Sequence, residues 1–137
     1  SALSWKWRVR KFPEGGNETI PGRMDSAASV YVYFKSGVRE YVIKYVWSVS
    51  LDKGKTFETA DSNYFKKMQL VVQEGVPAVA GQWRTEEVNL TSDFRRFFRD
   101  GKADGEVPPI AGIGILTDGD GTMKPSEADY AGFQLIE

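Results

Sequence analysis

Residues 110–122 read Ile-Ala-Gly-Ile-Gly-Ile-Leu-Thr-Asp-Gly-Asp-Gly-Thr, and the prediction of the fold begins here. The first eight residues, Ile110–Thr117, are apolar and rich in isoleucine, which is typical of a buried strand. Gly112 and Gly114 interrupt this strand, and glycine inside a strand often marks the close approach of another backbone or a large aromatic ring. The remaining five residues form a loop in which carboxylate and hydroxyl oxygens alternate with glycine.

Strand patterns recur on both sides of this stretch. The segments have apolar and polar residues in alternation, or nearly continuous apolar residues, and turn residues separate them. They are residues 5–10, 28–34, 40–49, 67–73, 82–90 and 129–136. Residues 56–64 are polar and are expected to form a long loop with a short extended piece. The segment 5–10 is expected to be a core-facing edge strand.

One segment has the pattern of a helix. Residues 91–101 begin with Thr-Ser-Asp, which can cap the free N–H groups of a first turn. Phe94, Phe97 and Phe98 follow at the spacing of one helical face, and Gly101 is a suitable stop. A helix of about three turns is not stable alone, so it is expected to pack on the end of a sheet.

About eight short strands and one helix favour an all-β fold. Strands do not alternate with helices, which makes a parallel sheet with crossover helices unsuitable. We therefore predict one domain over residues 1–137, an antiparallel β-sandwich of the jelly-roll type.

The composition restricts the chemistry that this chain can perform. It contains no cysteine and no histidine, which excludes disulfides, thiolate nucleophiles and histidine-dependent catalytic triads. The net charge of −1 gives no basic field for nucleic acid. No apolar run approaches the roughly 18 residues of a membrane span. Catalysis, if any, would depend on carboxylates, Lys, Arg, Tyr, or a hard cation held by oxygen.

Five stretches, in this order, carry a resemblance to a known family. They are Trp5-x-Trp7-x-Val9, Arg23-Met24-Asp25-Ser26-Ala27-Ala28 leading into Val30-Tyr31-Val32, Tyr45-Val46-Trp47-Ser48, Val71-Val72 with Glu74-Gly75, and Ile113 to Thr122. Their order and spacing resemble the bacterial family known as domain of unknown function 3047, over nearly the whole chain. The apolar strand ending in Thr-Asp-x-Asp-x-Thr is the most specific part.

The resemblance implies a jelly roll similar to the galactose-binding domains that include many carbohydrate-binding modules. Members usually carry export signals, which implies a periplasmic or secreted protein, although Ser1-Ala2-Leu3 is not such a signal. The family often ends its final strand with Tyr-Gly-Asp-Ile, whereas this chain has Tyr130-Ala131-Gly132-Phe133. A carboxylate is therefore absent where related sandwiches place a calcium ligand.

The aspartate-rich loop suggests a structural calcium ion. Its oxygens resemble part of a calcium-binding loop, and the predicted ligands are Asp118, Asp120, Thr122 and Asp129. The match to an EF-hand loop fails at Met123, where a glycine would turn the chain. The alternative is a turn that joins two strands and binds no metal.

Aromatic residues on the predicted strands suggest a carbohydrate ligand, because the C–H faces of sugar rings stack on aromatic rings. The predicted binding residues are Tyr31, Tyr33, Tyr41, Tyr45, Trp47 and Trp83. The alternative is that these residues fill the core, as large aromatic residues of sandwiches commonly do.

The sequence therefore favours a non-catalytic, carbohydrate-binding β-sandwich. Two other functions remain open: a small hydrolase or lyase that acts on glycans through carboxylates, and a structural or adaptor domain that binds protein. Glu86 and Glu87 are neighbours on a predicted strand, so they point to opposite faces and do not form a catalytic pair.

Overall fold

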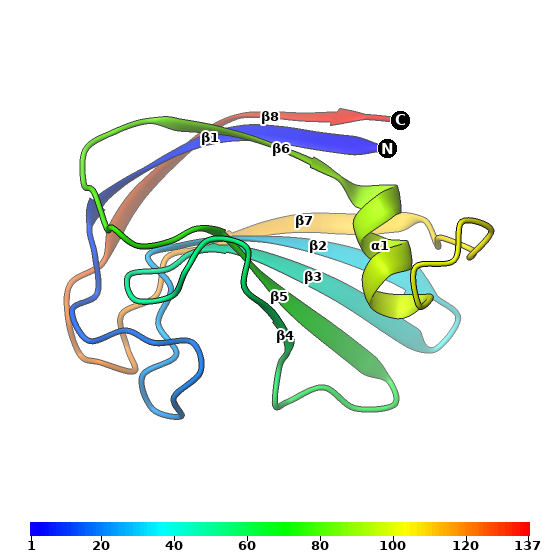
Figure 1. Cartoon of the computed structure of the whole chain (residues 1–137), viewed down its shortest axis with the longest axis horizontal. Helices are drawn as coiled ribbons and strands as arrows, with labels where there is room; N and C mark the ends of the chain where they lie inside the picture. Colours follow the sequence, from blue (N-terminus) through cyan, green and yellow to red (C-terminus); the bar gives the residue numbers. More distant parts are fainter.

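The computed structural model describes all of residues 1–137 and contains two β-sheets packed face to face (Figure 1). The elements in chain order are β1 (Ala2–Lys11), β2 (Ala28–Ser36), β3 (Arg39–Trp47), β4 (Thr56–Glu58), β5 (Lys66–Glu74), β6 (Arg84–Asn89), α1 (Leu90–Phe98), β7 (Ile110–Leu116) and β8 (Glu127–Ile136). The predicted all-β sandwich with one short helix is confirmed. No helix is long and apolar enough to cross a bilayer.

The two sheets differ in size and in strand direction. The smaller sheet has the order β6-β1-β8 and is antiparallel throughout. The larger sheet has the order β4-β5-β3-β2-β7 and is mixed, because β3 and β5 run parallel. The prediction of purely antiparallel layers is wrong at this pair. A long connection that contains β4 separates β3 from β5, and such a connection allows the second strand to enter from the same end.

Aromatic residues from both sheets form the core between the layers. Trp5 and Trp7 of β1 lie edge to face with ring centroids 5.3 Å apart, and Trp7 also packs on Trp47 of β3. Val9 completes the buried face of β1. Each large apolar side chain that is fully buried contributes about 1.5–3 kcal/mol, so this cluster is the principal source of stability.

Two strands occupy positions in the sheets other than those predicted. Strand β1 is the centre of the smaller sheet and not an edge, because β6 and β8 pair with its two sides. Strand β7, predicted to be buried, is an edge of the larger sheet, and Ile113 and Ile115 are 40% and 53% exposed. Strand pairing, which local patterns do not specify, places these strands in the sheets.

Helix α1 covers one end of the sandwich (Figure 1). Asn89 caps its N-terminus, where its side-chain oxygen accepts a hydrogen bond from the Ser92 N–H at 2.9 Å. Phe94 is fully buried, and its ring lies 4.8 Å from that of Phe34 and 5.2 Å from that of Tyr41. The prediction that the helix packs on a sheet end is confirmed, and its cap, Asn89, lies two residues before the predicted Thr-Ser-Asp, which begins at Thr91.

The loop 99–109 lies beside α1, and several other long loops lie at the opposite end of the sandwich (Figure 1). They include residues 12–27, between β1 and β2, and residues 117–126, between β7 and β8. A second apolar cluster, made of Val46, Leu51, Leu70 and Val72, lies on the side of the larger sheet that faces away from the main core. These features shape the outer surface of the larger sheet.

Candidate functional site

A hollow of about 770 Å³ lies on the outer face of the larger sheet. Its base consists of side chains from four neighbouring strands: Tyr31 of β2, Lys44 of β3, Met68 and Leu70 of β5, and Phe57 of β4. The loops 12–27, 59–61 and 117–126 provide the walls. Volumes of this size are typical of small-molecule sites, which combine apolar walls with a few polar groups.

Asp25 joins the two longest loops of the hollow. It is only 1% exposed and accepts hydrogen bonds from the Gly121 N–H at 3.0 Å and from both the N–H and the hydroxyl of Thr122 at 2.7 Å. Burial raises the pKa of Asp25, but these hydrogen bonds outweigh that effect and keep the pKa below its usual range. Asp25 is therefore a charged clamp at neutral pH.

Glycine is required where the aspartate-rich loop folds over this clamp. A Cβ atom on Gly121 would lie 3.1 Å from the Asp25 Oδ1 atom, and one on Gly119 would lie 2.3 Å from the Lys124 carbonyl oxygen. The chain turns at Met123, whose φ of 60° lies in the left-handed region although Met123 is not glycine. Met123 therefore makes the turn that a glycine makes in an EF-hand loop, in a backbone conformation that is unusual for a residue other than glycine.

Asp25, Asp118 and Asp120 bring three carboxylates together, with one oxygen of each within 4.8 Å of the others. Burial and the neighbouring Asp120 carboxylate raise the pKa of Asp118 to about 6, with a further contribution from Asp25. Grouped carboxylate oxygens are the donors that calcium prefers. The donor chemistry therefore fits a hard cation.

Glu18 is a second buried carboxylate on the wall of the hollow, with 3% exposure. The hydroxyls of Ser26 and Ser48 each donate a hydrogen bond to it at 2.7 Å. Both serines belong to stretches that carry the family resemblance, as do Asp25 and the aspartate-rich loop. Three of those five stretches therefore meet at one place in the structure.

Tyr31 and Tyr33 lie side by side on the outer face of β2. Their rings are nearly parallel, with an interplanar angle of 9° and centroids 6.1 Å apart. Gly114 on the adjacent β7 lies beside this pair, and a Cβ there would lie 3.5 Å from the Tyr33 ring, an ordinary van der Waals distance. The expected approach of an aromatic ring is found at Gly114 but not at Gly112, where a Cβ would have nothing within 4 Å. The Lys44 ammonium lies 5.2 Å from the Tyr31 ring centroid.

The other predicted aromatic residues do not join this surface. Tyr41, Tyr45 and Trp47 are 5%, 0% and 2% exposed and belong to the main core, so the expectation that they line an exposed platform is corrected. Alternate residues of β3 face the outer surface. The aromatic residues of β3 face the core, because this orientation of the strand buries more apolar area than the reverse. Trp83 is exposed but lies next to β6 of the smaller sheet, where the Arg8 guanidinium stacks on it.

The four predicted metal ligands do not all belong to the carboxylate cluster. Asp118 and Asp120 belong to the carboxylate cluster, whereas Thr122 uses its hydroxyl as a donor to Asp25. Asp129 lies outside this cluster, on β8, where it binds Arg8 and Arg10 at 2.7 and 2.6 Å. Hydrogen bonds from Arg8 and then Arg10 lower the pKa of Asp129. The placement of Asp129 in the metal site is corrected.

Sequence reasoning missed Glu18, Asp25 and Lys44 as residues of the site. Asp25 had a signal, because it lies within the Arg23–Ala28 stretch of the family resemblance. Glu18 and Lys44 had none: the first lies in a polar loop, and the second is the one charged residue within the stretch 41–47 of β3. Only the folded chain brings these two residues to the same hollow.

Comparison with known proteins gives one match. The model of the family described as "Protein of unknown function (DUF3047)" matches residues 1–134, nearly the whole chain. No curated protein and no solved structure matches it.

Proposed function

Because this chain belongs to the DUF3047 family, whose description states no function, we propose a function from the hollow itself: non-catalytic binding of a carbohydrate. The observation that carries the proposal is the pair of parallel tyrosine rings beside a hollow lined by carboxylates and one lysine. Sugar rings require an apolar surface for their C–H faces and polar groups for their hydroxyls. The hollow offers both kinds of surface within one concave site.

The rigidity of the site supports this proposal. Tyr31 and Lys44 stand on central strands, and paired strands place side chains more accurately than loops do. The two buried acids are fixed by hydrogen bonds from serine hydroxyls and backbone N–H groups. A preformed site loses little conformational freedom when a ligand binds.

A binding experiment on soluble glycans tests the proposal. We expect affinity electrophoresis against a panel of polysaccharides to show retarded migration for at least one, and Tyr31→Ala to abolish the retardation. Trp83→Ala is the matched control, because this exposed aromatic lies outside the hollow. Equal migration in every gel, or equal loss with both variants, would contradict the proposal.

The second candidate is a carboxylate-dependent hydrolase or lyase that acts on glycans. It is favoured by the presence of Glu18, Asp25, Asp118 and Asp120 around one hollow, since glycoside cleavage commonly uses a pair of acids. Product release that is lost on Asp118→Asn or Glu18→Gln, with the glycan still bound, would favour this candidate. Binding without turnover favours the first.

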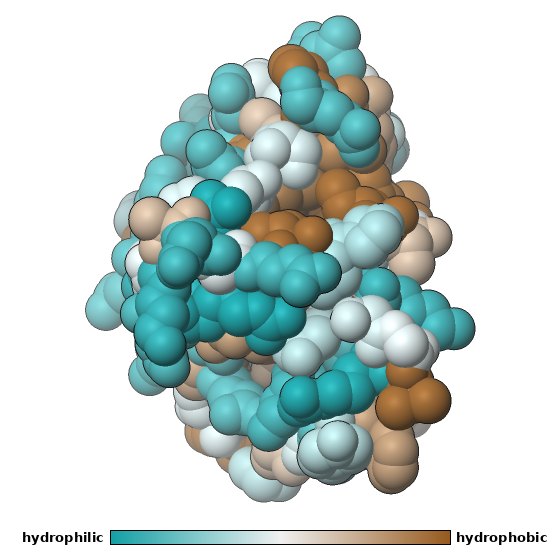
Figure 2. Space-filling view, turned by 90° about the vertical axis from the view of Figure 1, so that its right-hand side faces the viewer, coloured by the Kyte–Doolittle hydropathy of each residue, from teal (hydrophilic) through white to brown (hydrophobic).

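The third candidate is an adaptor that binds protein along the free edges of the sheets. Strands β7 and β8 are edges of the two sheets, and Ile113, Ile115, Phe133 and Leu135 are 39–53% exposed there. Figure 2 shows apolar surface gathered in its upper right part, beside mostly hydrophilic surface. This candidate predicts that Ile115→Lys prevents association with a protein partner and leaves glycan retention unchanged.

Two further proposals accompany the first. A calcium ion on Asp25, Asp118 and Asp120 is proposed as a structural cofactor that stabilises the folded chain. The periplasmic or secreted location implied by the family is likewise a proposal, and cell fractionation with an antibody against this chain tests it.

A further inference from the structure

The hollow has a strong imbalance of charge. Its lining contains six carboxylates, from Glu18, Asp25, Glu58, Asp61, Asp118 and Asp120, and a single ammonium, from Lys44. The whole chain has 19 acidic and 18 basic residues, so the imbalance is local and does not reflect the composition. Nearly a third of all acidic side chains face one site.

Ion pairs within the protein neutralise only one of these six acids. Of the five ion pairs in the structure, one involves the hollow, between Glu58 and Lys67 at 3.6 Å. Glu18 and Asp25 are almost fully buried, yet hydroxyl and backbone N–H groups are their only hydrogen-bond partners. Buried charges are normally paired, so these acids lack the positive charge that such positions usually have.

The apolar base of the hollow indicates which kind of positively charged ligand would fit there. Met68 and Leu70 of β5 and Phe57 of β4 give it an apolar base beside the Tyr31 ring. A calcium ion on Asp25, Asp118 and Asp120 would meet only three of the six acids and would make no use of this surface, and a simple polyamine makes no use of it either. A ligand that combines an apolar face with a positive group uses both the base and the acids.

We infer that the ligand of the hollow is an amino sugar that carries a protonated amine, a conclusion that rests on the proposed carbohydrate-binding function. Its ring packs over the apolar base and the tyrosines, and its ammonium donates charge-assisted hydrogen bonds to the carboxylates, which are about twice as strong as neutral ones. Uronic acids and sulfated sugars are repelled by the same carboxylates. A neutral sugar forms only the neutral hydrogen bonds.

Calorimetric titration with three tetrasaccharides tests this inference, with chelator present throughout. The ligands are β-1,4-linked glucosamine, the same tetramer with every amine acetylated, and a tetramer of galacturonate. We expect glucosamine to bind at least about tenfold more tightly than its acetylated form, and galacturonate not to bind. Added salt is expected to weaken only the glucosamine complex, because salt screens exposed charges.

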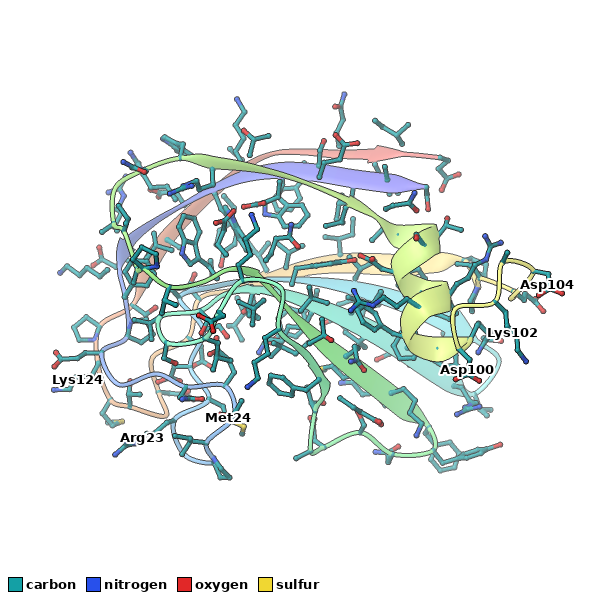
Figure 3. All side chains as sticks on the ribbon, viewed as in Figure 1. Arg23, Met24, Asp100, Lys102, Asp104 and Lys124 are labelled. Atoms are coloured by element: carbon teal, nitrogen blue, oxygen red, sulfur yellow. The ribbon has the colours of Figure 1, made fainter.

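A pair of variants assigns the effect to the hollow. The double variant Asp118→Asn, Asp120→Asn removes two charges from it, whereas Asp104→Asn, Glu106→Gln removes two charges from the exposed loop after α1. Figure 3 shows Asp104 at the end of the molecule opposite Met24, which lines the hollow. The first variant should weaken glucosamine binding by about two- to tenfold, as expected for two partly exposed charges. The second should leave it unchanged. Asp25 is kept because it clamps the loop.

The outcomes separate this inference from the proposed function. Equal affinity for the glucosamine tetramer and its acetylated form, or binding of galacturonate, overturns the inference and leaves carbohydrate binding intact. Absence of binding by every sugar here, together with failure of the polysaccharide panel, overturns both. Binding that appears only when the titration is repeated with calcium in place of chelator overturns the inference as well, because the acids then serve a metal. An unchanged affinity in the Asp118→Asn, Asp120→Asn variant overturns the assignment to the hollow.

Discussion

Glu86 of β6 is an acid placed between the two sheets. It is 4% exposed, and the Trp7 indole N–H donates a hydrogen bond to its carboxylate at 2.9 Å. Burial, followed by the neighbouring Glu74 carboxyl, raises the pKa of Glu86 from its ordinary 4.5 to about 7. Its chain neighbour Glu87 is exposed, which confirms that the two glutamates point to opposite faces.

This environment predicts a loss of stability as the pH rises. Folded Glu86 holds its proton more tightly than the unfolded chain does, so the free energy of unfolding falls between about pH 4.5 and pH 7. Glu86→Gln keeps an acceptor for Trp7 and removes the charge. We expect this variant to be more stable than the natural chain at pH 8, on the order of 1–3 kcal/mol. Urea unfolding from pH 5 to pH 8 measures the difference. Glu87→Gln should show the same pH dependence of the free energy of unfolding as the unsubstituted chain. The same dependence in Glu86→Gln would contradict the assignment of this effect to Glu86.

Asp25 changes the stability with pH in the direction opposite to Glu86. Its pKa is lowered in the folded state, so its contribution to stability is present at neutral pH and disappears as the pH falls below about 4. Asp25→Ala leaves the Gly121 and Thr122 N–H groups without their partner and should cost about 2 kcal/mol. Thermal unfolding at pH 7 measures the loss, and amide exchange at Gly121 and Thr122 should accelerate. Thr122→Val removes only one of the three hydrogen bonds, so a loss as large as that of Asp25→Ala would contradict the clamp.

At the scale of the element, helix α1 depends on its cap and on one buried face. Its N-terminal N–H groups have no partners within the helix, and Asn89 provides one acceptor. Asn89 is the last residue of β6, and α1 begins at the next residue, so the chain changes direction there. The cap therefore fixes the direction in which the helix leaves the sheet.

Removal of this cap gives a prediction for the element. Asn89→Ala should lower the free energy of unfolding by about 1 kcal/mol, because the Ser92 N–H loses its acceptor. Asn89→Asp keeps an acceptor at the same position and should restore most of the loss. Chemical denaturation of the three proteins provides the measurement. Equal losses of the free energy of unfolding in Asn89→Ala and Asn89→Asp would contradict a contribution of the capping hydrogen bond.

At the scale of the whole molecule, the carboxylate cluster connects both sheets. Asp25 lies just before β2 of the larger sheet, and the loop with Asp118 and Asp120 joins β7 of that sheet to β8 of the other. An ion held by these residues would restrain both layers at the end opposite α1. Any stabilisation would then appear in the unfolding of the whole domain.

The calcium proposal is tested by that global unfolding. Calcium that binds only the folded chain should raise its melting temperature, and an excess of chelator should lower it again. At a calcium concentration a hundredfold above Kd the expected gain is about 2.7 kcal/mol. Asp120→Asn should reduce the response, whereas Asp129→Asn, outside the cluster, should not. Identical melting curves with calcium and with chelator would remove calcium from the site.

The sequence by itself determined the local structure of this protein. The alternation of Trp5, Trp7 and Val9 and the spacing of the phenylalanines in α1 predicted the buried faces, because side-chain direction follows from the backbone period alone. The order of the quoted stretches indicated the family. Turn residues between these patterns placed the loops, including the aspartate-rich one, and local chemistry sufficed for all of this.

Only the tertiary structure decided which strand became an edge, and which carboxylates share a hollow. Tyr45 of β3 is an alternating aromatic like Tyr31 of β2, but the packing of the second sheet puts Tyr45 inside and leaves Tyr31 on the outer face. Glu18 and Asp120 are 102 positions apart in the sequence and line the same site. Such contacts depend on strand pairing across long separations, where free energy comes from burial summed over the whole molecule and not from any local preference.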